Sequence, residues 1–331
     1  FPGVDNDKDK TLSAMLRMAV IAQTQERYEK APVETDEQRA EKAALEGLVK
    51  QLFVELKRDF KPSDLPPYTL VKLGMHLAGT SQPEESIAYF DEILDPSEPD
   101  PVRKKARING MSKYRKNAVF GKAVALGRSK DNAKVDTAIK MMRDELSKEE
   151  SSANPDRKAM EDAQYNLVKF TSARQDWPAV IAAADKYREN KTYKKNLPEV
   201  LYLQGEAYLK QNELDKALIN FMNITGTYKG LVKWSAPAVL AQMDTLWKRN
   251  TMSQGAGKQP SDRYVAWKAG SQYVQLLDTP ANRKKMTAED SALVNEVKDK
   301  TAKFGSDPAV SQERADIAAY EAAVRAAKGQ K

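Results

Sequence analysis

The chain has 331 residues, of which 41% are hydrophobic and 31% charged, with a formal net charge of +7 and a mean hydropathy of −0.67. No apolar run approaches the roughly eighteen residues that a membrane-spanning helix needs. The absence of cysteine excludes disulfides, thiolate metal sites and cysteine nucleophiles. Helix-favouring residues are abundant and β-branched runs are scarce, so the composition predicts an all-helical protein.

The apolar pattern predicts helices from the beginning of the chain to its end. Apolar residues recur at helical spacing over 11–30, and Thr35-Asp36 followed by Glu37 and Gln38 is typical of a helix start. Further helical stretches are predicted at 45–56, 67–95, 102–126, 135–146, 159–173, 177–187, 197–225, 236–249, 263–277, 287–304 and 311–327. Composition predicts loops at 147–156 and 250–262.

Two of the predicted hairpins share one internal spacing. A glycine is followed twelve residues later by a small residue and sixteen residues later by a phenylalanine: Gly74, Ser86 and Phe90 in one, Gly205, Ala217 and Phe221 in the other. Tyr208 adds an aromatic residue three positions after the second glycine. The spacing resembles that of the tetratricopeptide repeat, in which small residues let two helices pack closely. The chain departs from the family signature at Leu70, Leu201, Gln204 and Leu77.

The resemblance implies an all-α fold, a tetratricopeptide-like right-handed solenoid of helical hairpins. A single hairpin cannot bury its apolar face alone, so copies stack and atypical segments cap the ends. The predicted organisation is an N-terminal cap or degenerate repeat at 1–62, a solenoid at 63–278 and a C-terminal cap at 279–331.

The resemblance also implies a function, because tetratricopeptide proteins hold a peptide or a partner helix in the groove lined by their first helices. On the matched helices the groove-facing positions are Tyr68, Val71, Met75, Glu199, Tyr202, Glu206 and Leu209. Some members of the family clamp a carboxyl terminus with Lys, Asn and Arg, and these residue types are missing from the matched positions. An aromatic, apolar and acidic groove favours a partner segment that bears basic residues. The alternative is that these side chains pack internally.

A second candidate surface is the basic segment 102–130, which contains no acidic residue. Its first half carries Arg103, Lys104, Lys105, Arg107, Lys113, Arg115 and Lys116. This segment could bind an anionic polymer such as nucleic acid, an anionic glycan or lipid head groups. Alternatively, it faces the adjacent segment 84–100, in which every charged residue is acidic, and much of the field cancels.

Catalytic signatures are weak. His76 is the one histidine and is expected to lie between helices. The glycine-containing stretch 253–260 lacks the spacing of a phosphate-binding loop. The expectation is therefore a non-catalytic interaction scaffold without a cofactor. The start at Phe1-Pro2-Gly3 rather than Met is expected either where a signal segment has been removed or where a chain has been trimmed. The lack of cysteine fits a periplasmic or secreted bacterial protein, with a cytoplasmic location as the alternative.

Overall fold

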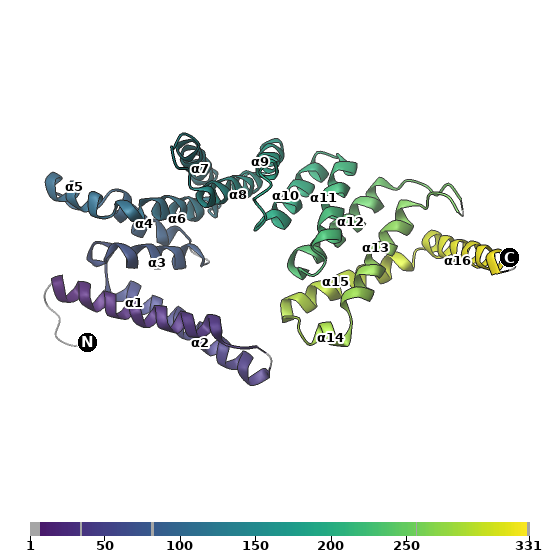
Figure 1. The fold of residues 1–331 in the computed structure, drawn as a ribbon, viewed down its shortest axis with the longest axis horizontal. Coiled ribbons are helices and arrows are strands. Elements are labelled where there is room, and N and C mark those ends of the chain that lie inside the picture. Colours follow the sequence, from purple (N-terminus) through teal and green to yellow (C-terminus); the bar gives the residue numbers. More distant parts are fainter. Residues whose placement is uncertain (1–6, 34, 81–82, 256, 330–331) are drawn as a thin grey trace. The chain divides into compact units, whose positions relative to one another are not determined.

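The computed structural model describes residues 7–33, 35–80, 83–255 and 257–329, and every secondary-structure element in these ranges is a helix. The chain divides into two compact units, Phe1–Arg174 (unit 1) and Gln175–Lys331 (unit 2). Within each unit, helices pack against their neighbours in chain order, as in an α-solenoid (Figure 1). The all-helical prediction is confirmed. The predicted division into a cap at 1–62, a solenoid at 63–278 and a cap at 279–331 stays a prediction. It distinguishes repeats from caps by their sequence pattern, whereas the two units are distinguished by their compactness.

Unit 1 begins with a long pair of helices and continues with shorter ones. Its helices are α1 (Asp7–Lys30), α2 (Asp36–Asp59), α3 (Pro67–Ala78), α4 (Ile87–Leu94), α5 (Pro101–Gly110), α6 (Arg115–Gly127), α7 (Asn132–Glu150) and α8 (Arg157–Ala173). Short 3-10 segments lie at η1 (Pro62–Asp64), η2 (Pro83–Ser86) and η3 (Ser112–Tyr114). One hydrophobic cluster extends from α1 to α6 and includes Phe53 and Phe90. Helix α5 contributes no buried residue.

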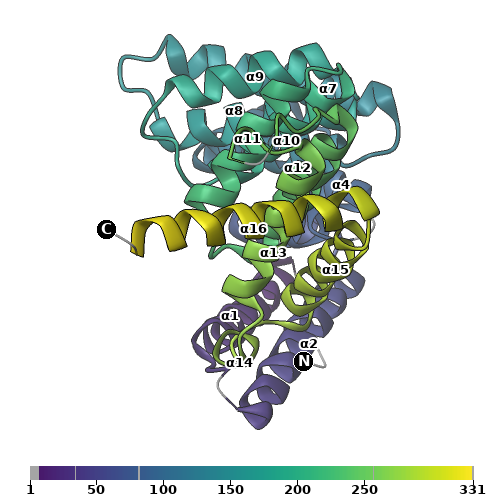
Figure 2. The same ribbon diagram turned by 90° about the vertical axis from the view of Figure 1, so that its right-hand side faces the viewer.

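The helices of unit 2 also pack against their neighbours in chain order. Its helices are α9 (Trp177–Glu189), α10 (Leu197–Lys210), α11 (Leu214–Thr227), α12 (Val232–Arg249), α13 (Asp262–Leu277), α14 (Pro280–Arg283), α15 (Ala288–Gly305) and α16 (Pro308–Gly329). Its largest cluster joins residues of α11, α12, α13 and α15, among them Met243 and Phe304. In Figures 1 and 2 the C-terminal end of α16 reaches beyond the other helices of this unit. None of the helices in the described ranges combines the length and apolar character that crossing a bilayer requires.

Two predicted helix starts are confirmed with their capping interactions. The hydroxyl of Thr35 accepts a hydrogen bond from the backbone N–H of Gln38, and the Gln38 side chain accepts one from the backbone N–H of Thr35. Thr287 and Asp290 form the same reciprocal pair at the start of α15. Such boxes satisfy backbone donors that a helix start leaves free, which is why the pattern is readable from sequence.

Two predicted boundaries are wrong. The helix expected over 102–126 is broken between α5 and α6, where Met111 turns into the core and η3 follows. The loop expected over 147–156 begins only after Glu150, because α7 continues. Glu149, within that extension, is buried and pairs with Lys116 of α6 at 2.6 Å. A tertiary contact therefore extends a segment whose local composition resembles a loop.

The glycines of the repeated spacing lie against phenylalanine rings. A Cβ built on Gly74 would lie 2.8 Å from the ring of Phe90, and one on Gly205 would lie 2.6 Å from the ring of Phe221. Ser86 and Ala217, the small residues twelve positions later, are fully buried. The small residues thus lie inside the helix pairs as predicted, and the phenylalanine sixteen positions later occupies the space that a glycine side chain would need.

We expect Gly205→Ala to destabilise unit 2 by about 1–3 kcal/mol, because the new methyl group would overpack the buried Phe221 ring. Gly226→Ala is the control: it lies near the end of α11 with nothing within 4 Å of the added Cβ, so it should be neutral or stabilising by up to about 1 kcal/mol. Urea unfolding measures both. The cost at Gly205 should shrink in a Phe221→Leu background, and equal costs in the two backgrounds would show that the ring is not the obstacle.

Candidate binding surfaces

A pocket of about 510 Å³ opens on unit 1 where α3, α6 and α8 lie next to one another. We call it the groove pocket. Met75 lies on its α3 side, Phe120 and Val124 on its α6 side and Asn166 on its α8 side. These helices correspond to the first helices of three hairpins predicted from the sequence. Lys116 of the predicted anion patch lies in the same pocket.

Two cations at the groove pocket are already held by the protein. The ammonium of Lys116 lies 2.6 Å from a carboxylate oxygen of Glu149 and 3.1 Å from one of Asp156. The hydrogen bond that Lys116 donates to Glu149 raises the pKa of Lys116. The guanidinium of Arg128 donates to the backbone carbonyls of Ala78 and Thr80. These contacts use most of the positive charge at the pocket to join helices.

The groups left open in the groove pocket are apolar surfaces, amides and the exposed ammonium of Lys158. The side chain of Met75 is 52% exposed, and those of Phe120 and Val124 are partly exposed. Asn117 is exposed, and the Asn166 side chain donates to the carbonyl of Asp162 at 2.9 Å, which leaves its oxygen as an acceptor. An apolar side chain with a polar backbone beside it fits such a lining.

The three groove positions predicted on α3 have different environments in the structure. Met75 lines the groove pocket. Tyr68 is 46% exposed, with the ammonium of Lys72 5.6 Å from its ring centre. Val71 is only 6% exposed and belongs to the hydrophobic core. The expectation that Val71 faces a partner is therefore wrong, because α3 turns this position towards its neighbouring helices.

All four groove positions predicted on α10 are partly exposed in unit 2. The ring of Tyr202 lies 5.8 Å from that of Phe221 and 6.3 Å from that of Trp234 on α12. Glu206 shares a hydrogen bond with Tyr202, and burial raises the pKa of this carboxyl group. Leu209 packs against the small hydrophobic cluster of α10 and α11. Glu199, the remaining predicted groove position, lies in the first turn of α10.

The basic segment is paired with acids only in part. Of its ten cations, Lys104, Arg107, Lys116 and Lys122 form ion pairs, three of them with the acidic segment 84–100. Lys104 lies 2.6 Å from Asp95, and Arg107 lies 3.0 Å from the buried Glu92. In α6, Lys122 pairs with Asp91 at 2.6 Å, and in η3 Lys113 lies over the ring of Tyr114. The cations of this segment that are exposed and form no ion pair within the described ranges are Arg103, Lys105, Lys113, Arg115, Arg128 and Lys130. Anion binding by this segment would depend on them.

His76 lies where the sequence placed it, between helices. Its ring stacks on that of Phe53 at 4.0 Å, and burial lowers its pKa, with the charge of Lys50 adding to the effect. A search of the described residues for three or more neighbouring His, Asp or Glu side chains that could hold a metal gave no group.

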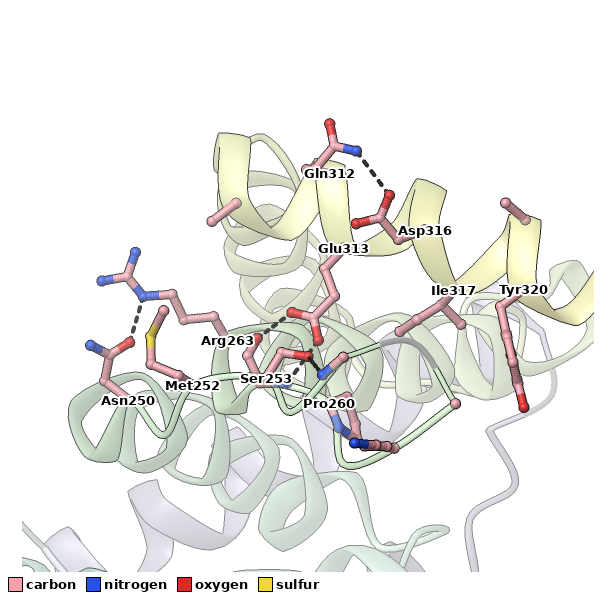
Figure 3. A pocket seen from close by; sticks show the side chains of 16 residues that line it. Asn250, Met252, Ser253, Pro260, Arg263, Gln312, Glu313, Asp316, Ile317 and Tyr320 are labelled. Atoms are coloured by element: carbon pink, nitrogen blue, oxygen red, sulfur yellow. Dashed lines mark hydrogen bonds between the residues drawn. The ribbon is translucent and has the colours of Figure 1, made fainter.

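A second pocket, of about 850 Å³, lies between α16 and the predicted loop 250–262 (Figure 3). Ile317 and Tyr320 point from α16 towards the loop, whereas Gln312 points away. The polar groups here bind one another. Glu313 accepts hydrogen bonds from the backbone and hydroxyl of Ser261, and Arg263 donates to Asn250 at 2.8 Å. The bonds between Ser261 and Glu313 attach α16 to its unit.

The groove pocket contains residues that the sequence did not single out. Asn117, Phe120 and Val124 of α6 recur at helical spacing on one side, beside Gly121. The one feature of the sequence that could have pointed to these residues is Gly121. It lies where α6 approaches another helix closely, since a Cβ added there would lie 2.2 Å from the ring of Phe90. It marks the side of α6 that approaches α4, and the residues flanking it are those that reach the pocket.

Comparison of the chain with protein-family models, curated proteins and solved structures gave no significant match.

Replacing Lys116 with Gln should destabilise unit 1 by about 1–3 kcal/mol, because it leaves the buried Glu149 carboxylate without its charged partner. Lys113→Gln removes the same charge from an exposed side chain without an ion pair and should change stability by less than about 0.5 kcal/mol. Urea unfolding of the two variants distinguishes a stabilising ion pair from a general effect of net charge.

The carboxyl groups around Lys116 also predict that the folded state becomes less stable at low pH. The pKa of Glu149 is lowered, first by the hydrogen bond from Lys116, and that of Asp156 is lowered, first by the backbone N–H of Ala159. Carboxyl groups with lowered pKa values in the folded state stabilise it above their unfolded pKa, and this stability is lost as pH falls through the folded value. The melting temperature should fall below about pH 4, and less steeply in Lys116→Gln. Identical slopes would contradict the assignment.

Proposed function

We propose that the chain is a tetratricopeptide-like, non-catalytic interaction scaffold that binds a peptide segment of a partner protein. The observation that carries the proposal is the groove pocket, to which three successive first helices contribute and in which Met75, Phe120 and Val124 leave apolar surface open. An apolar partner side chain would enter between Met75 and Phe120. The amides of Asn117 and Asn166 would bond the backbone beside it.

The chemistry of the pockets supports binding rather than turnover. Two cations of the groove pocket, Lys116 and Arg128, are held by carboxylates and by backbone carbonyls, respectively. At the second pocket, Glu313 of α16 is engaged with Ser261, and Arg263 of α13 with Asn250. A candidate general acid or base needs a perturbed pKa and a reactive neighbour in the same cleft. The groove pocket instead offers shape, apolar surface and amides.

Photo-crosslinking tests the proposal. A benzoylphenylalanine side chain at Met75 should give a defined protein adduct in an extract of cells that make this protein. The same side chain at Met222 of α11, which is exposed to a similar degree (54% against 52%), should not give that adduct. Equal adducts from both positions would refute a role of the groove pocket.

A purified partner then permits a quantitative prediction. Met75→Glu should weaken its binding about tenfold in calorimetry, because a charge would be buried against the partner's apolar side chain. Met222→Glu should leave the affinity unchanged. Both exposed substitutions should keep stability within about 0.5 kcal/mol. An unchanged affinity of Met75→Glu would exclude the groove pocket as the binding site.

A further inference from the structure

Unit 2 carries an aromatic surface that its own core holds in place. Tyr202 of α10 and Trp234 of α12 lie with ring centres 6.3 Å apart and planes inclined by 47°. Tyr202 also packs on Phe221, which is fully buried. The two rings are therefore fixed from behind while both remain partly exposed.

Two carboxylates, Glu206 and Glu296, act on Tyr202 of this pair of rings. Glu206 lies one helical turn after Tyr202 and shares a hydrogen bond with it. Glu296 of α15 is exposed, and its charge reaches Tyr202. Within the described part of the chain, neither carboxylate forms an ion pair. The nearest cations are Lys210, whose charge acts on Glu206, and Lys233, 5.4 Å from the ring centre of Trp234.

The chemistry of this surface selects a cation. Aromatic faces attract ammonium and guanidinium groups, most strongly where water is partly excluded. A guanidinium also forms charge-assisted hydrogen bonds with carboxylates while stacking on a ring. We propose that Tyr202, Trp234, Glu206 and Glu296 bind an arginine or lysine side chain presented by a partner segment. This inference rests on the proposed function only in assigning the cation to a partner protein.

The surface is also sensitive to pH. Burial raises the pKa of Glu206, and the hydrogen bond from Tyr202 and the charge of Lys210 oppose the shift only in part. The groups that face Glu206 and its neighbour Tyr202 are Lys210 on α10, Trp234 with Lys233 on α12 and Glu296 on α15. A carboxyl group with a raised pKa becomes neutral at a higher pH than usual. Affinity for a cation should therefore fall as pH is lowered, beginning above the ordinary range of a glutamate.

Two soluble peptides of equal shape test the proposal. Octa-arginine should bind the full chain in calorimetry, and octa-citrulline, which lacks the charge, should bind at least about tenfold more weakly. Glu206→Gln and Glu296→Gln should each weaken octa-arginine binding by about fivefold or more. Glu321→Gln, which removes the same charge from an exposed position on α16, should have no effect. The loss of affinity at low pH should be smaller in Glu206→Gln.

Equal binding of the two peptides, or equal affinities of wild type and Glu206→Gln, would overturn the proposal. Trp234→Leu adds a readout of the aromatic part, and circular dichroism shows whether that variant still folds. Failure of the Met75 crosslinks with retained octa-arginine selectivity would refute the groove pocket and leave the cation site standing. The reverse result would refute the cation site alone.

Discussion

The close approach of phenylalanine rings to glycines determines how the helices of this protein are spaced. Phe90 of α4 occupies the space next to both Gly74 of α3 and Gly121 of α6, so one buried ring brings two helices together. Gly121 also lines the groove pocket. The distance between α3 and α6 therefore depends on Gly74 and Gly121 having no side chain. The width of the pocket depends on the same two glycines. Phe221 against Gly205 and Phe170 against Gly127 repeat the arrangement.

Ion pairs between consecutive helices form the second layer of organisation. Buried Glu92 and Glu149 receive Arg107 and Lys116 from elements that are separate in sequence. A buried carboxylate requires a charged or hydrogen-bonded partner, so each of these pairs fixes the register of its helix against the next. Lys104, Arg107 and Lys122 thus pair the basic segment with the acidic segment before it. Within the described residues, Arg103, Lys105, Lys113, Arg115 and Lys130 are exposed and form no ion pair.

Sequence alone predicts most of this fold because helix patterning and capping are local. Thr35 and Thr287 start helices through bonds made within three residues, and the glycine spacing predicts which helices meet. The extension of α7 to Glu150 could not be predicted, because its cause, Lys116, lies on another helix. The site is less predictable for the same reason. Met75 and Lys116 were assigned to different surfaces, yet they line one pocket.

Charged side chains that form ion pairs within the chain stabilise the fold, whereas a carboxylate without such a pair is available to a ligand. Side chains that exchange ion pairs within the chain, such as Lys116 and Arg249, are engaged by Glu149 and Asp262 and offer little to a ligand. In unit 2, Arg249 donates to Asp262 at 2.6 Å and 2.8 Å, which fixes the start of α13. Glu206, in contrast, is partly buried and has a tyrosine as its hydrogen-bond partner. A carboxylate kept in such a place costs stability unless a cation joins it. In a chain of net charge +7, an acidic and aromatic surface is the exception, and that is why its ligand is expected to be positively charged.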